Sequence, residues 1–234
     1  MPGPGGSKKT PWPWILGGCG GCLVLIIIGM VVAFAVMVPT ARKIIHQSQT
    51  LNSRTRAGGF VLFTNELANT PASLKPYYSW FSFEYPSKFT VVPDEENFIK
   101  LEEKADDGSV LENLAVGHIT VPAGTNNDDA YPELMQRLSD QLGRGFQIYR
   151  ELDRVPETVD GVQGLGMHWQ ATITNTPKGD VQFYGRVILV RKPDQEKGVA
   201  IIMIATSFDE DVENAHDVGV KGDLAGILAS FRLE

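Results

Sequence analysis

The chain has 234 residues, of which 43% are hydrophobic, and its formal net charge is −7 at pH 7. The charge is unevenly spread: the first 65 residues hold six Lys and Arg and no acid, and the remainder holds 15 basic and 28 acidic residues. A segment with this excess of acids repels phosphate backbones, so nucleic acid is excluded as a partner.

Residues 15–38 are predicted to form a transmembrane helix, preceded by a polar N-terminal tail at residues 1–14. The run contains no charged side chain. As a helix it would be about 36 Å long, which exceeds the hydrocarbon core of a bilayer, roughly 30 Å thick. We therefore expect a single-pass membrane protein that contacts the lipid bilayer through residues 15–38.

Two other interpretations of this run fit the sequence less well. Ala33 and Ala35 have the spacing of a signal-peptide cleavage site, but the run is longer than a signal sequence needs and continues to Val38. Residues 16–19 resemble a lipoprotein box, yet such a box follows an apolar run and this one precedes it. We therefore expect an uncleaved signal anchor.

Cys19 and Cys22 are the only cysteines of the chain. Their C-x-x-C spacing occurs in redox pairs and in halves of metal sites. Since no other cysteine and no nearby histidine accompanies them, we interpret them as small side chains that let membrane helices approach closely. The sequence assigns no catalytic, cofactor-binding or metal-binding residue, here or elsewhere.

Basic residues lie on both sides of the predicted span, so their distribution alone does not fix the orientation of the span in the membrane. Arg42, Lys43, Arg54 and Arg56 follow the span and, by the positive-inside rule, would keep the domain in the cytoplasm. A short basic tail before a long apolar run is, however, typical of an export anchor, and long C-terminal domains translocate largely regardless of charge. We favour an extracytoplasmic globular domain.

Residues 39–75 are predicted to be a juxtamembrane connector, and residues 76–234 a globular domain. The connector is polar at first and contains a short apolar patch at residues 60–67. The domain shows the alternation of apolar and polar residues that is typical of strands. Strands are predicted at residues 81–85, 98–103, 114–121, 167–174, 181–191 and 199–207.

Two amphipathic helices complete the pattern of an α+β domain. Asp128 or Asp129 is expected to cap the first helix, which ends at Gly143. The second helix has an apolar face formed by Leu224, Ile227, Leu228 and Phe231. The simplest architecture is an antiparallel sheet of about five to seven strands with helices on both faces.

Two short motifs resemble the PsbP fold. Residues 83–89, FEYPSKF, resemble its opening F-x-Y-P-x-x-F, and residues 227–231, ILASF, resemble its closing I-x-x-S-F. That α/β/α sandwich is shared by the extrinsic PsbP subunit of photosystem II and a small Ran-binding nuclear import protein. The resemblance, over residues 79–234, implies a binding or assembly module and supplies no catalytic residue. The membrane anchor departs from photosystem PsbP, a soluble lumenal protein.

The four histidines have no local metal-binding spacing. His46 lies in the polar connector. His118 shares a strand face with Leu114 and Val116, which favours a half-buried, hydrogen-bonded side chain over a metal ligand. His168 lies on the polar face of its strand. His216 follows acids at residues 209–213, which lack the glycine and the last acid of a calcium loop and are interpreted as a solvated helix start.

The remaining motifs do not favour an enzyme. The glycine-rich residues 161–166 precede a strand, so they lack the helix N-terminus that binds dinucleotide phosphates. The chain has no G-x-S-x-G elbow, and its cysteines lie in the span. We expect a membrane-anchored, noncatalytic interaction or assembly module with a protein partner. The alternatives are a membrane-tethered hydrolase with a non-local active site and a small-ligand or lipid-binding sensor.

Overall fold

The computed structural model describes residues 54–56 and 59–234. The polar tail, the predicted span at residues 15–38, both cysteines and His46 lie outside these residues. Within the described part of the chain, no helix has the length and apolar character needed to cross a membrane. The predicted membrane anchor therefore stays a prediction.

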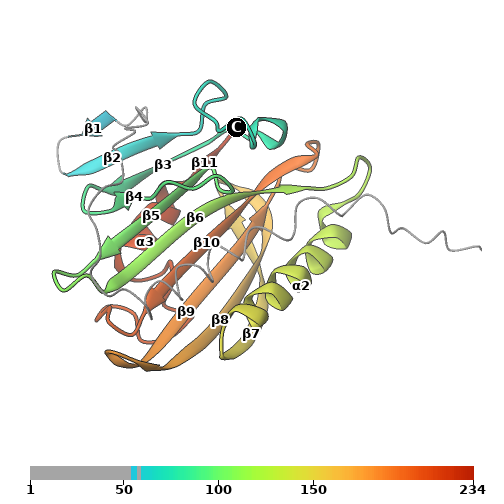
Figure 1. The fold of residues 1–234 in the computed structure, drawn as a ribbon. Helices are drawn as coiled ribbons and strands as arrows, with labels where there is room; N and C mark the ends of the chain where they lie inside the picture. The colour runs from blue at the N-terminus through green and yellow to red at the C-terminus, as the bar shows by residue number, and fades with distance from the viewer. Residues whose placement is uncertain (1–53, 57–58) are drawn as a thin grey trace, which may run out of the picture.

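The centre of the domain is a large sheet of seven antiparallel strands (Figure 1). Its spatial order is β4-β5-β6-β10-β9-β8-β7, so the chain builds one half, crosses to the far edge and returns to the middle. The strands are β4 (Thr90–Val91), β5 (Ile99–Lys104), β6 (Val110–Thr120), β7 (Ile148–Val159), β8 (Val162–Thr176), β9 (Gly179–Val190) and β10 (Lys197–Thr206).

Among the described residues, a second, small sheet and three helical segments pack around the large sheet. The small sheet has the order β1-β2-β3-β11. Its strands are β1 (Arg54–Arg56), β2 (Phe60–Thr64), β3 (Phe81–Pro86) and β11 (Arg232–Leu233). The helical segments are the 3-10 turn η1 (Lys75–Tyr77) and the α-helices α2 (Asn127–Gly145) and α3 (Gly222–Ser230).

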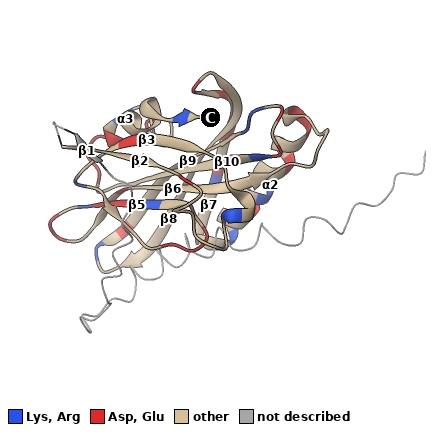
Figure 2. Ribbon diagram, turned by 90° about the horizontal axis from the view of Figure 1, so that it is seen from above, with Lys and Arg blue, Asp and Glu red and all other residues tan. Residues whose placement is uncertain are grey.

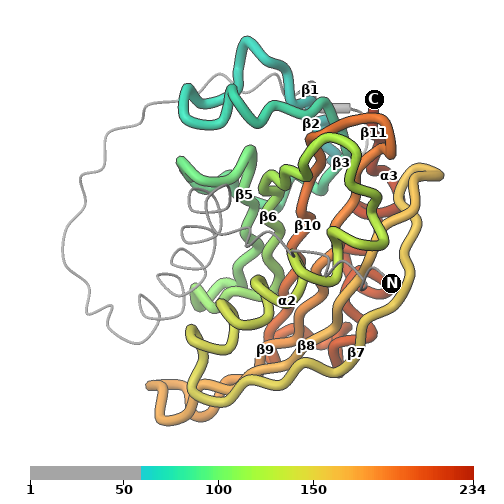
Figure 3. Tube along the Cα trace, turned by 90° about the vertical axis from the view of Figure 1, so that its right-hand side faces the viewer, coloured from blue at the N-terminus to red at the C-terminus, as the bar shows by residue number. Residues whose placement is uncertain are grey.

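The large sheet is covered on both faces, as predicted. Helix α2 packs on one face over Met167 and Trp169 of β8. Helix α3 and the small sheet cover the other face, where Leu224 and Ile227 join the core (Figures 1 and 3). Central strand β10 is buried on both faces because its side chains alternate between the two cores. The predicted α+β class with an antiparallel sheet and helices on both faces is confirmed.

Several sequence predictions differ from the structure in detail. The strand predicted at residues 81–85 belongs to the small sheet and not to a single central one. Asn126 caps α2, since its side chain accepts a hydrogen bond from the backbone N–H of Asp129. Strand β7 was not predicted, because it is a half-exposed edge strand rich in charged residues, without a clean apolar alternation.

The predicted connector also contains the strands β1 and β2, and β2 contributes to the core. Phe63 in β2 pairs with Phe83 in β3 and is 5% exposed, so it belongs to the core. The packed part of the chain thus begins before residue 76, where the globular domain was predicted to start. The sequence missed β2 because its apolar patch is short and stands alone among polar residues.

The two motifs that resemble the PsbP fold lie against each other. The ring of Phe231 stacks on that of Phe83 with centroids 5.5 Å apart. The backbone N–H of Glu84 donates to Ser230 Oγ at 2.8 Å, which joins α3 to β3. The predicted core face of the closing helix is therefore present, although Leu228 is only partly buried.

Candidate functional site

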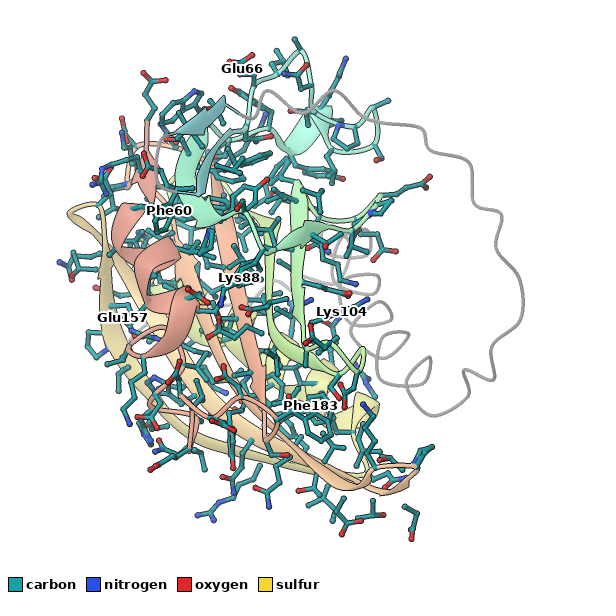
Figure 4. All side chains as sticks on the ribbon, turned by 90° about the vertical axis from the view of Figure 1, so that its left-hand side faces the viewer. Phe60, Glu66, Lys88, Lys104, Glu157 and Phe183 are labelled. Carbon is teal, nitrogen blue, oxygen red and sulfur yellow. The ribbon has the colours of Figure 1, made fainter. Side chains whose placement is uncertain are left out.

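An acidic pocket lies between helix α3, the loop before it and strands β5 and β6. Its volume is about 350 Å³. Six carboxylates and one ammonium group line it, and we define the acidic pocket by these side chains: Lys88, Glu103, Glu112, Asp209, Glu210, Asp211 and Asp223. In Figure 4, Lys88 lies between α3 and the two strands. Acidic residues in the β5–β6 loop are also evident in Figure 2.

Lys88 bridges two of the carboxylates. Its Nζ lies 2.7 Å from Glu103 Oε1 and 2.5 Å from Asp223 Oδ2. Burial disfavours the ammonium form, but the hydrogen bonds and charges of Asp223 and Glu103 outweigh it and raise the pKa of Lys88. This lysine therefore stays charged and compensates part of the negative charge of the pocket.

Glu112 is the most buried acid of the pocket, at 2% exposure. Its Oε2 accepts a hydrogen bond of 3.2 Å from the backbone N–H of Leu224, in the first turn of α3. Burial and the charges of Asp209, Asp223 and Glu103 raise the pKa of Glu112 to about 8, against the opposing effect of the Leu224 N–H. A large part of Glu112 is consequently protonated at neutral pH.

The first residue of α3, Gly222, has the conformation that Glu112 requires. Gly222 has φ +65°, and a Cβ there would lie 2.4 Å from Glu112 Oε1. A side chain at this position would therefore displace the Glu112 carboxylate and strain the backbone. Asp209 lies in the loop between β10 and α3, where burial, followed by the charges of neighbouring acids, raises its pKa.

A second group of titratable residues, the histidine cluster, consists of Asp153, His168 and His216. His168 Nδ1 is 2.7 Å from Asp153 Oδ1, and His216 Nε2 is 2.8 Å from Asp153 Oδ2. The two imidazole rings have centroids 4.7 Å apart. Burial disfavours ionisation of Asp153, but the hydrogen bonds from His216 and His168 outweigh it and lower its pKa.

Three separate elements position the histidine cluster. Asp153 follows an irregularity in the pairing of β7 with β8, which turns its side chain toward His168 on β8. His216 comes from the loop before α3, where its backbone N–H donates to Asn214 Oδ1. His168 is 6% exposed, whereas 57% of the His216 side chain is accessible. One side of the cluster is thus open to solvent.

His118 lies apart from both groups. Its ring stacks on that of Tyr77 with centroids 4.1 Å apart, and burial lowers its pKa. Neither ring nitrogen has a hydrogen-bond partner among the described residues. The side chain is half-buried, as predicted from the face it shares with Leu114 and Val116, but the hydrogen-bond partner that the sequence led us to expect is absent among the described residues.

The acidic pocket and the histidine cluster are both formed by residues that lie far apart in the sequence. Glu103, Glu112 and Asp223 come from β5, β6 and α3, and no local motif connects them. Asp209 and Asp211, read from the sequence as a solvated helix start, line the acidic pocket instead. Of the glycines at residues 161–166, Gly161 lies in the turn before β8, and Gly164 and Gly166 lie in β8, so this segment enters a strand as predicted.

No protein-family model and no curated protein matches the chain. Among solved structures, cyanobacterial PsbP from Synechocystis sp. PCC 6803 is similar with a TM-score of 0.48 and 14% identity, over 79% of this chain and 99% of that one. The Saccharomyces cerevisiae Ran-binding protein Mog1p has a TM-score of 0.40 and 15% identity, over 65% of this chain and 89% of that one.

A third similar structure is LpqN of Mycobacterium tuberculosis, which is involved in cell envelope biogenesis. Its TM-score is 0.45 and its identity 10%, over 68% of this chain and 85% of that one. PsbP and the Ran-binding protein are the two proteins whose fold the sequence motifs resemble. All three TM-scores lie below 0.5, so we draw no conclusion from these similarities about what the chain binds.

Proposed function

We propose that this protein is a membrane-anchored, noncatalytic interaction module that binds a positively charged partner. The predicted span at residues 15–38 would hold the domain at a bilayer, on the extracytoplasmic side. The observation that carries the proposal is the acidic pocket, where six carboxylates face one ammonium group. Even with Glu112 protonated, such a concave group of acids attracts cations and repels anionic groups.

Matched charge reversals test the binding site. Glu210 and Asp128 are both exposed, but only Glu210 lines the acidic pocket. We expect Glu210→Lys to weaken the binding of a fluorescent lysine-rich peptide by about tenfold. Asp128→Lys changes the net charge equally and should leave binding within about twofold of wild type. Fluorescence anisotropy of the full chain in neutral detergent measures both.

Two results would contradict the proposed binding site. The first is equal weakening by both charge reversals, which would show an effect of net charge alone. The second is a wild-type chain that does not bind the peptide at low salt, where attraction between exposed charges is strongest.

Extraction of membranes tests the anchor separately. With a C-terminal tag on the full chain, we expect the protein to remain in the membrane pellet after alkaline carbonate treatment. Protease added to intact cells or spheroplasts should remove the tag if the domain is extracytoplasmic. Full-length tagged protein in the soluble fraction would contradict the anchor, and a protected tag would reverse the orientation.

The histidine cluster is the observation that favours a hydrolase as the second candidate. A carboxylate that orients an imidazole is a common arrangement of a general base. Among the described residues, however, no hydroxyl group is hydrogen-bonded to His168 or His216. Assays with nitrophenyl esters and phosphates decide between the two candidates. A wild-type activity that His216→Asn abolishes would replace the binding module by the hydrolase.

A further inference from the structure

Three carboxylates of the acidic pocket converge on one point. The ligand oxygens of Glu103, Glu112 and Asp223 all lie within 4.8 Å of one another. Oxygens bound to one Ca²⁺, at about 2.3–2.6 Å from the ion, lie no more than about 5 Å apart. The three side chains are therefore already as close as a shared ion would require.

Lys88 occupies the place of a cation in this arrangement. Its ammonium group bridges Glu103 and Asp223, but 53% of its side chain is exposed. A long, flexible side chain that is half in solvent can leave the carboxylates without disturbing the core. One ammonium group also balances only one negative charge of this site, whereas a divalent ion would balance two.

Glu112 gives independent evidence for a ligand. Its Oε1 is buried without a hydrogen-bond partner among the described residues. Its Oε2 is held by the Leu224 N–H, so the carboxylate is fixed in orientation while one oxygen remains available. A buried acceptor without a partner is costly to a folded protein, and a bound cation would remove that cost.

We propose that Glu103, Glu112 and Asp223 bind Ca²⁺ and that Lys88 is the cation that Ca²⁺ displaces. This inference rests on the proposed function, because it assigns a ligand to the same acidic pocket. The donors are all carboxylate oxygens, which bind hard cations such as Ca²⁺ in preference to softer cations such as Zn²⁺. Ca²⁺ tolerates irregular geometry with about six to eight oxygen ligands, and water would complete the set, whereas Mg²⁺ needs a regular octahedron.

Calorimetric titration of the metal-free full chain in neutral detergent with CaCl₂ tests this site. Glu112→Gln keeps the shape of the protonated acid but removes the anionic ligand, so it should weaken Ca²⁺ binding by about tenfold or more. Lys88→Met removes the competing cation and should strengthen binding by a similar factor. Circular dichroism of each variant checks that it is folded.

Lys104→Met is the matched control for Lys88→Met. Lys104 is 52% exposed and pairs with Glu102, so its removal changes the net charge equally without freeing the proposed ligands. Ca²⁺ affinity of this variant should stay close to that of wild type. Equal gains in Lys88→Met and Lys104→Met, or undiminished binding in Glu112→Gln, would overturn the site.

The result also separates this inference from the proposed function. If neither wild type nor Lys88→Met binds Ca²⁺ while the lysine-rich peptide still binds, the calcium site is refuted and the interaction module stands. If Ca²⁺ binds with the expected order among the variants but the peptide does not, the calcium site stands and the positively charged partner is refuted.

Discussion

Glu112 is an acid buried beneath α3, and its protonation couples stability to pH. Its pKa is raised from 4.5 to about 8 in the folded protein. Between these values the folded protein holds a proton that the unfolded chain releases, so the free energy of unfolding falls as the pH rises. Glu112→Gln has no such proton. In metal-free buffer, its stability relative to wild type should increase by up to about 1.4 kcal/mol per pH unit over this range.

Denaturant titrations of wild type and Glu112→Gln between pH 5 and 9 measure how the difference in their free energies of unfolding depends on pH. Curves of stability against pH that run parallel for wild type and Glu112→Gln would show that Glu112 titrates near its ordinary pKa. The direction matters: a carboxylate held in a strong ion pair would give the opposite slope, with stability lost as the pH falls.

Gly185 is required by packing and not by backbone conformation. A Cβ at this position would lie 2.0 Å from the ring of Trp169, which is fully buried. Gly185→Ala should therefore destabilise the domain by about 1–3 kcal/mol or more. Gly226→Ala is the control, because a Cβ there meets nothing within 4 Å. Because Gly226 is exposed in a helix, Gly226→Ala should stabilise the domain by about 0.5–1 kcal/mol. Thermal denaturation of the Gly185→Ala and Gly226→Ala variants beside wild type measures both effects.

The faces of single residues were predictable from the sequence, but their long-range neighbours were not. The alternation around Met167 and Trp169 correctly placed His168 on the opposite face, since side-chain direction follows from local period. The pairing of His168 with Asp153 and His216 depends on a strand irregularity and a loop path. Neither feature leaves a signal in local spacing.

At the scale of elements, helix α3 contributes to the core through one face. Ile227 is 1% exposed, whereas Leu228 is only partly buried. Ile227→Ala should cost about 2–5 kcal/mol through lost burial and the cavity left behind, and Leu228→Ala should cost less. Urea denaturation ranks them. A loss under about 0.5 kcal/mol for Ile227→Ala, usual for surface substitutions, would show that α3 does not pack as described.

Strand β2 belongs to the folded unit because it pairs with β3 and buries Phe63. A fragment of residues 59–234 should unfold cooperatively, and a fragment of residues 76–234 should lose that transition. The second fragment leaves the edge of β3 unpaired and exposes the core that Phe63 covers. Calorimetry of both fragments shows where the folded domain begins. Identical unfolding transitions for the two fragments would show that the domain begins at residue 76.

For the whole molecule, the sequence predicted the α+β class and helices on both faces, because long apolar strands such as β10 and amphipathic helices carry local periodicity. It did not predict the division into two sheets, which depends on pairing between β2, β3 and β11. The acidic pocket was equally hidden, since Glu103 and Glu112 belong to a hairpin while Asp223 lies far along the chain.

For the whole molecule, we propose that a membrane-anchored domain binds positive charge in its acidic pocket. The most direct measurement reconstitutes the full chain in vesicles of neutral phosphatidylcholine and sediments them with the fluorescent lysine-rich peptide. We predict that the protein sediments with the vesicles and carries the peptide in wild type and Asp128→Lys, but much less in Glu210→Lys. Protein left in the supernatant, or equal peptide on all three vesicle preparations, would contradict the account.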